Sequence, residues 1–432
     1  MAPNLAVPEA PAEEHFLGHV VGSAHDVQAS EDIVTANGVK LLAKGAKVDE
    51  SMRDKLLAHK LTRPLEQCLE VTDAVSGELL ASVAEKLFDD QPLLCTLHGD
   101  AKPRHVVAAL KRLPLTTQLR SLLSLYAELP SGRLEHPVAV ALIASGLARK
   151  VLPDEGGQER TLLTAGLFHD IGELYVNPQY LNGDVRLDPS QWRHIVAHPV
   201  IGHRVLRDME GAGRMVADAV LQHHERRDGF GYPQRLAGEA LPLRGEILGA
   251  AEWLAGLIRS GRSPVTSASA ATRLMPGGFR ESIMRAIAPF GASEAAGAGI
   301  ASADTGKVLA GLVRLAETMG RFRQCREWIE GLIDAGSEAS AVLAANHARM
   351  ELIERSFISS GLSGEEPLVL FERLNAIGDA ELFGELSVIV REISWRLREL
   401  ERDTLLRASA LSPDDERVVK SMVARLKHSD PV

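Results

Sequence analysis

Apolar residues recur at helical spacing through most of the chain after about residue 102. Runs such as 138–152, 160–175 and 244–258 place apolar side chains three and four residues apart, the period of a helix with one buried face. Gly and Pro interrupt this pattern in three segments that we interpret as interhelical loops: 152–157, 176–190 and 227–242. The pattern predicts an all-helical bundle at residues 101–296.

The first hundred residues have a more mixed pattern. β-branched residues flank Asn37 and Gly38, a dipeptide that favours a tight hairpin turn. The following segment has helical spacing, and Asp49 is expected to cap its start. We therefore expect a small α/β module at residues 15–100, preceded by a Pro- and Ala-rich disordered start at residues 1–14.

Small residues dominate segments 260–271 and 291–306, which are typical of linkers. Long helical patterns with dense charges follow, so we expect a helical C-terminal region at residues 297–432. Its apolar stripe favours self-association, such as a homodimer, or a signalling partner, although a core face has the same pattern. The predicted fold class is therefore mainly α, with an N-terminal α/β module and a C-terminal helical extension.

Composition excludes several kinds of protein. A formal net charge of -10 over 432 residues argues against binding a nucleic-acid polymer, which requires a basic face. Cys68, Cys95 and Cys325 are scattered, so neither a thiolate zinc site nor a disulfide framework is expected. No segment reaches the roughly 20 apolar residues of a membrane span, and the opening lacks a secretory pattern. We expect a cytoplasmic protein with no membrane span.

Histidines and carboxylates occur in five segments of the predicted bundle. A lone histidine is usually a satisfied core or surface residue, and His194 and His203 are interpreted in this way. A lone His-Asp dipeptide is also common by chance. Five segments that converge from one bundle favour a metal site instead. The candidate ligands are His136, His169, Asp170, His198, His223, His224 and Glu252.

Imidazole nitrogens and carboxylates together suit first-row transition ions such as Fe, Mn, Zn or Ni. A carboxylate flanked by histidines can bridge two such ions, and Asp170, directly after His169, is the expected bridge. Two ions about 3.5–4 Å apart can activate water and hold both oxygens of a phosphoryl displacement. This chemistry predicts a metal-dependent phosphohydrolase.

The motifs themselves resemble those of a known family. "HD" at His169 and Asp170, "HP" at His198 with Gly202 beyond it, and "HHERRDGFGYP" at 223–233 resemble the signature of the HD-GYP cyclic di-GMP phosphodiesterases. The resemblance covers roughly residues 103–290. It implies an HD-type helical fold with two divalent ions, for which Fe or Mn is expected. It also implies hydrolysis of cyclic di-GMP to pGpG, or further to GMP, in bacterial signalling.

The resemblance implies a role for each matching residue. His136, His169, Asp170, His198, His223 and His224 correspond to metal ligands, and Asp170 is the expected catalytic residue. Glu252 stands where the family usually has an aspartate ligand. Gly229 and the residues after it would form the loop at the pocket mouth. The residues expected to bind substrate are Gly231, Tyr232, Pro233, Arg226 and Arg227, with Arg244 a further candidate phosphate partner.

The sequence departs from the family pattern in three places. Glu173 replaces a lysine that reaches a substrate phosphate, and its spacing of four from His169 predicts one shared helical face, where it either coordinates metal or faces solvent. Gly132 stands where members with a third ion have a glutamate, which favours two ions. Arg262 is the one candidate remnant of a later basic segment.

These departures leave two alternatives to a cyclic di-GMP phosphodiesterase. The first is a degenerate receptor that binds metal or cyclic di-GMP without turnover and signals to partners. The second is a phosphohydrolase that acts on another nucleotide. Turnover in a fully metallated sample distinguishes the phosphodiesterase from the receptor. A panel of substrates distinguishes cyclic di-GMP from another nucleotide.

Overall fold

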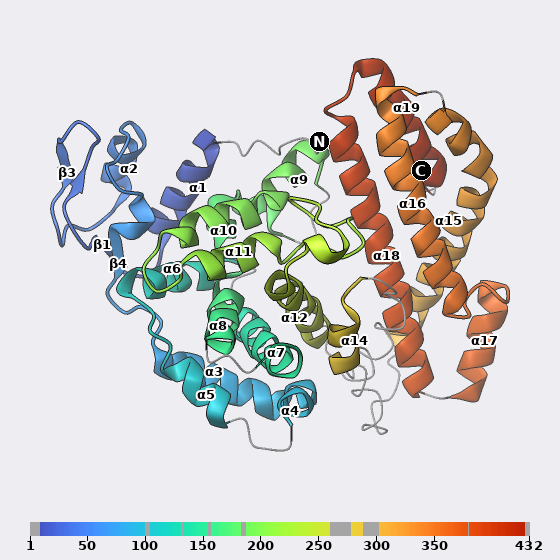
Figure 1. Cartoon of the computed structure of the whole chain (residues 1–432), viewed down its shortest axis with the longest axis horizontal. Coiled ribbons are helices and arrows are strands. Elements are labelled where there is room, and N and C mark those ends of the chain that lie inside the picture. The colour runs from blue at the N-terminus through green and yellow to red at the C-terminus, as the bar shows by residue number, and fades with distance from the viewer. Residues whose placement is uncertain are drawn as a thin grey trace. The chain divides into compact units, whose positions relative to one another are not determined.

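The computed structural model describes residues 9–99, 104–130, 133–153, 157–182, 187–259, 278–287, 302–334, 336–378 and 380–427. These residues are mainly helical with a few short strands, which confirms the predicted fold class (Figure 1). The chain divides into two compact units. Unit 1 comprises residues 1–186, 194–260 and 278–286, and unit 2 the remainder. Among the described helices, none is both long and apolar enough to cross a membrane.

Unit 1 begins with the predicted α/β module. Gly38 has a φ of +83° in the turn between β2 and β3, as the Asn-Gly dipeptide predicted. Asp49 caps α2 by accepting the N–H of Ser51 at 3.0 Å. The disordered start is wrong from Glu9 onward, since a helix begins there. The elements are α1 (Glu9–Gly22), β1 (Val27–Ala29), β2 (Ile33–Val34), β3 (Lys40–Leu42), α2 (Glu50–Leu57), η1 (Leu65–Gln67) and β4 (Leu69–Val71).

Two antiparallel strand pairs, β1 with β4 and β2 with β3, make up the sheet part of this module. The next helices are α3 (Gly77–Asp90), α4 (Pro92–His98), α5 (Arg104–Lys111) and α6 (Thr117–Ala127). α3 and α4 pack on α7 (Glu135–Val151), whereas α6 packs on β4. The module therefore contacts the helical core directly through α3 and α4, and α6 packs on its strand β4.

The helical core is built around α7 and α8, which pack closely on each other. Every residue of α7 from Pro137 to Ala148 is buried, as expected for a helix that is apolar on all sides. The core elements are α7 (Glu135–Val151), α8 (Gln158–Phe168), η2 (Ile171–Tyr175), η3 (Pro178–Tyr180), α10 (His198–Arg207), α11 (Arg214–Gln222), η4 (Gly238–Ala240), α12 (Leu243–Arg259) and α14 (Glu281–Ile287). Residues of α9 (Pro189–Val196) belong in part to each unit.

Unit 2 has a hydrophobic core of its own, which includes Phe322, Phe357 and Phe383. Arg349, only 6% exposed, pairs with Asp403 at 3.2 Å inside it. The apolar faces of these helices therefore pack in the core of unit 2. Self-association or binding of a signalling partner remains a prediction. The helices are α15 (Ser302–Asp334), α16 (Glu338–Ser359), α17 (Pro367–Ile377), α18 (Ala380–Ala408) and α19 (Pro413–Leu426), so α15 begins inside the second predicted linker.

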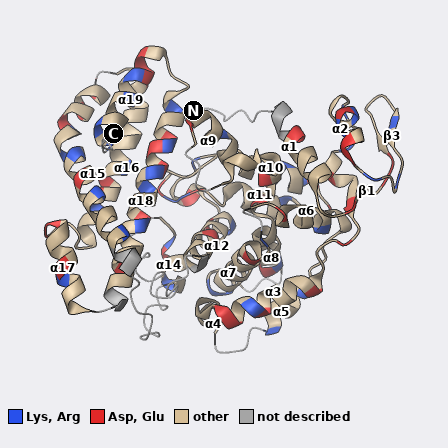
Figure 2. Ribbon diagram, turned by 180° about the vertical axis from the view of Figure 1, so that it is seen from behind, with Lys and Arg blue, Asp and Glu red and all other residues tan. Residues whose placement is uncertain are grey.

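Figure 2 shows acidic and basic residues interspersed along the helices of both units. The first predicted linker, residues 260–271, lies outside the described residues.

Close packing of α7 and α8 depends on Gly166. A Cβ at this position would lie 2.4 Å from Cα of Ala141, so we expect Gly166→Ala to lower the free energy of unfolding by about 1–3 kcal/mol. Gly256→Ala in α12 is the matched control, because a Cβ there has no neighbour within 4 Å. It should stabilise by about 0.5–1 kcal/mol. Urea denaturation measures both, and equal stability of the two variants would contradict the packing.

Candidate metal centre

The structure brings all seven predicted ligands together from five segments. They form two groups, and within each group the ligand atoms lie within 4.8 Å of one another. Six of them stand at helix ends: His136 in the first turn of α7, His169 and Asp170 just after α8, His198 at the start of α10, and His223 and His224 just after α11. Glu252 lies within α12. The first group is Asp170, His198, His223 and His224; the second is His136, His169 and Glu252.

Asp170 lies between the two groups, and each of its carboxylate oxygens faces a different one. Oδ1 is 3.2 Å from Nε2 of His198 and 3.5 Å from Nε2 of His223. Oδ2 is 2.9 Å from Nε2 of His169 and 3.8 Å from Nε2 of His136. This is the disposition of a carboxylate that can bridge two ions.

Three of the histidine rings are held in place in the same way. In each, Nδ1 lies 2.6–2.8 Å from the backbone carbonyl three residues earlier. Because a carbonyl can only accept, Nδ1 carries a proton, so Nε2 is the nitrogen directed at the centre, where its lone pair can bind a metal ion. The pairs are His169 with Gly166, His198 with Ile195, and His223 with Val220.

The second group fits a cation. Nε2 of His169 and Oε2 of Glu252 are buried without a hydrogen bond, yet lie 3.1 Å apart. Oε2 of Glu252 is also 3.1 Å from Nε2 of His136. With a neutral imidazole, lone pairs face each other across these short distances, which is unfavourable unless a positive charge is shared between them. Nitrogen and carboxylate donors in this arrangement suit a divalent transition ion.

The pKa shifts of the ligands also favour a positive charge at the centre. Burial alone would lower the pKa of His169, but Asp170 and Glu252 raise it well above its ordinary value. Burial opposes the charge of Asp170, yet the adjacent histidines hold the pKa of its carboxyl well below the usual range. Burial, together with His223 and His198, lowers the pKa of His224. The carboxylates are therefore anionic at neutral pH, and positive charge is favoured beside them.

Two glycines allow the ligand-bearing segments to approach each other. A Cβ at Gly172 would lie 2.1 Å from the carbonyl oxygen of His198, so η2 can contact the start of α10 only without a side chain there. A Cβ at Gly249 would lie 2.6 Å from the carbonyl oxygen of His223, which lets α12 pack beside the end of α11. Both glycines position ligands, and no motif in the sequence indicated this role.

The predicted loop folds back over His224. A Cβ at Gly231 would lie 2.5 Å from the carbonyl oxygen of His224, and the same oxygen accepts the N–H of Tyr232 at 3.1 Å. The ring of Tyr232 stacks on the imidazole of His224, with centroids 4.7 Å apart. Pro233 follows through a cis peptide bond. The structure thus brings Gly231 and Tyr232 beside the first ligand group.

Glu225 organises this loop and was missed as a functional residue. Its side chain is buried, and its carboxylate accepts N–H groups of Gln234, Arg235 and Leu236. Burial raises its pKa, against the effect of these hydrogen bonds. The only sequence signal was its position beside His224, because the three donors come from residues nine to eleven positions later.

The predicted substrate-binding arginines have partners within the loop region. Arg226 pairs with Asp228 at 2.6 Å, and Arg227 pairs with Glu239. Arg244 donates to the side-chain oxygen of Gln158 at 2.9 Å. None of these interactions places a guanidinium on a metal ligand. A role of the arginines toward phosphate therefore stays a prediction.

The expectation for Glu173 is wrong in one respect. α8 ends at Phe168, and a 3₁₀ helix begins at Ile171, so His169 and Glu173 do not share the face of an α-helix. Glu173 also belongs to neither ligand group found among the described residues. Burial lowers the pKa of His198, whereas Asp170 and then Glu173 raise it, which places the charge of Glu173 near the centre. Gly132 and Arg262 lie outside the described residues.

Tyr126 is a further residue of the centre that no motif indicated. It lies in α6, is buried, and its hydroxyl donates to Oδ2 of Asp170 at 3.5 Å. Burial and the neighbouring carboxylates raise its pKa, so it remains a protonated donor. The sequence pattern predicts a core position for a tyrosine on an apolar helix, so only the folded structure reveals this contact.

Comparison with known proteins agrees with the motifs. Residues 133–257 match the model of the HD domain family. A cyclic di-GMP phosphodiesterase of Pseudomonas aeruginosa is 41% identical over 25% of this chain and 26% of its own length. The cyclic di-GMP phosphodiesterase response regulator RpfG of Xanthomonas campestris is 31% identical over 25% and 29%. The 3'3'-cGAMP-specific phosphodiesterase 3 of Vibrio cholerae is 26% identical over 45% and 44%. The chain thus spans less than half the length of these relatives.

Removal of one ligand from the first group should lower the metal content. We expect His198→Gln to bind about one ion per chain, against about two in the unchanged protein loaded with Mn(II). His203→Gln is the matched control on the same helix, because His203 contacts Asp218 outside the centre. Elemental analysis of the purified proteins measures both. An unchanged metal content in His198→Gln would contradict the ligand assignment.

Proposed function

We propose that the chain is a metal-dependent phosphodiesterase that hydrolyses cyclic di-GMP to pGpG, or further to GMP, in bacterial signalling. The observation that carries this proposal is the position of Asp170, whose two oxygens face different groups of ligands. The names of the relatives from Pseudomonas and Xanthomonas support cyclic di-GMP as the substrate.

The seven candidate ligands would hold two divalent ions, for which we propose Fe or Mn. Such ions supply an activated water and neutralise charge that develops on the phosphate oxygens. Within the chain, Asp170 keeps the two ligand groups at a fixed separation. The backbone carbonyls behind His169, His198 and His223 fix the orientation of the rings. Tyr126 donates to Oδ2 of Asp170 and holds the carboxylate in its orientation.

Substrate would lie against the loop that covers His224. Tyr232, stacked on His224, offers an aromatic edge beside the first ligand group, while Gly231 and Pro233 set the shape of the loop. Arg226 and Arg227 flank the loop and would contact phosphate through their guanidinium groups. In this proposal the arginines provide orientation, and the metal ligands provide the reaction site.

Glu173 favours a second candidate function. A carboxylate whose charge acts on His198 stands where the HD-GYP family has a lysine, and it repels a substrate phosphate. A receptor that binds cyclic di-GMP without hydrolysis would tolerate this loss. Hydrolysis of another cyclic dinucleotide is a third candidate, favoured by the relative named a 3'3'-cGAMP-specific enzyme.

Turnover tests the proposal. Protein purified without oxygen and loaded separately with Fe(II) and Mn(II) should convert cyclic di-GMP to pGpG or GMP, resolved by chromatography. Metal content is measured on the same samples, and 3'3'-cGAMP is assayed beside it. Intact cyclic di-GMP that is bound tightly by fully metallated protein would select the receptor instead.

Asp170→Asn keeps the shape of the side chain but removes its charge, so we expect loss of turnover together with bound metal. Asp218→Asn is the control, since Asp218 is a partly exposed carboxylate that contacts His203. Both activity and metal content are measured. A fully metallated and active Asp170→Asn protein would refute the role of this carboxylate.

Reversal of the charge at position 173 should improve substrate binding. We expect Glu173→Lys to lower KM by about tenfold, because one hydrogen bond from a charged donor contributes about 1.5 kcal/mol. Glu173→Gln removes the repulsion without adding the donor, so its KM should fall less. Steady-state kinetics with metal analysis measures both. Loss of metal from Glu173→Gln would show instead that Glu173 supports the ions.

A further inference from the structure

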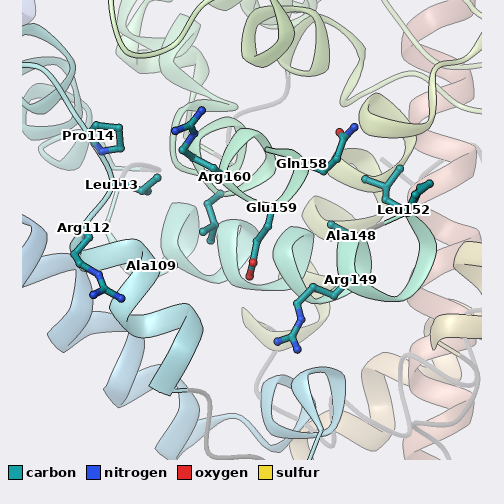
Figure 3. Close-up of a pocket in the computed structure, with 12 residues that line it drawn as sticks. Ala109, Arg112, Leu113, Pro114, Ala148, Arg149, Leu152, Gln158, Glu159 and Arg160 are labelled. Atoms are coloured by element: carbon teal, nitrogen blue, oxygen red, sulfur yellow. The ribbon is translucent and has the colours of Figure 1, made fainter. Parts of the chain in front are cut away.

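A cavity lies in unit 1, away from the metal centre. It has a volume of about 580 Å³ and lies among α5, the end of α7 and the start of α8 (Figure 3). The metal ligands stand at the opposite ends of the same helices, since His136 begins α7 and His169 follows α8. The length of α7 between His136 and Arg149 is about 20 Å, because a helix rises about 1.5 Å per residue. The cavity is therefore separate from the metal centre.

Three guanidinium groups line this cavity, those of Arg112, Arg149 and Arg160. Among the described residues, no carboxylate lies within ion-pair distance of any of the three. Arg149 donates instead to Nε2 of His105, and Arg112 donates to the backbone carbonyl of Ala108 at 3.1 Å. Three arginines that lack a paired carboxylate among the described residues make the lining of this cavity locally positive in a protein of net charge -10.

Glu159 is the one carboxylate among the described lining residues, and it is held by a different partner. Its Oε1 accepts the hydroxyl of the buried Ser145 at 2.7 Å. Figure 3 shows Glu159 between Arg112 and Arg149, with Arg160 on the side of Pro114. The positive excess is also felt nearby, because burial and then Arg149 lower the pKa of His105. One fixed carboxylate does not neutralise three arginines.

The remaining wall is apolar. Leu113 and Leu152 follow the ends of α5 and α7, Leu163 lies in α8, and the small side chains of Ala109 and Ala148 leave the space open. A volume of this size is within the range of sites for small organic ligands. Positive groups beside an apolar wall suit an organic anion that carries phosphate and a flat apolar part, because guanidinium binds phosphate through paired hydrogen bonds.

We propose that this cavity binds a nucleoside phosphate, with the phosphate bound by arginines of its lining and the base against the leucines. The first residues of α8, Gln158 to Arg160, line the cavity, so the positive end of the helix dipole lies beside it. Glu159 offers an acceptor for amino or imino groups of a base. The site does not depend on the function of the metal centre.

Binding of GMP to the full chain tests the proposal, measured by calorimetry on metal-loaded protein and on Asp170→Asn. Asp170→Asn should retain GMP binding at the cavity, whether or not the protein is a phosphodiesterase. In that background, Arg112→Gln with Arg160→Gln should weaken binding by at least about tenfold. Arg53→Gln with Arg417→Gln removes equal charge elsewhere and should leave GMP binding unchanged.

A variant that blocks the cavity by volume provides an independent arm. Ala109→Met should also weaken GMP binding without a change in charge, since Ala109 lines the cavity. Inorganic phosphate should bind more weakly than GMP because it cannot use the apolar wall. Unchanged GMP affinity in both cavity variants, or complete loss of binding in Asp170→Asn, would overturn the site. Equal affinity for phosphate and GMP would overturn the nucleotide as its ligand.

Discussion

The organisation of the helical core depends on one buried carboxylate held between two groups of histidines. Asp170 contacts both groups, and a carboxylate so placed is costly unless cationic partners surround it. The surrounding helices end or begin at the ligands, and Gly172 and Gly249 remove the side chains that would keep them apart. The packing of the core and the composition of the metal centre are therefore two aspects of one constraint.

Much of this arrangement could be predicted from the sequence, because its signals are local. Helical spacing gave α7, α8 and α12, and the His-Asp and His-His motifs identified ligands that the fold then brings together. The end of α8 could not be predicted, since "GLFHDIGELY" continues a helical pattern. The roles of Tyr126 and Glu225 depend on partners distant in sequence or at irregular spacing, which no periodicity reveals.

Charge is distributed unevenly within unit 1. The metal centre concentrates carboxylates and imidazoles at one end of α7 and α8, whereas arginines gather at the other end. Both helices are buried along most of their length, so each end is positioned by the same rigid packing. This explains how one compact helical core can present a cation site and an anion site without mutual neutralisation.

The most direct test of the account is anomalous diffraction from crystals of the protein loaded with Mn(II). Two manganese peaks about 3.5–4 Å apart, one on each side of the Asp170 carboxylate, are predicted. The first should be bound by His198, His223 and His224, and the second by His136, His169 and Glu252. A single peak, or two peaks that Asp170 does not bridge, would contradict the central claim.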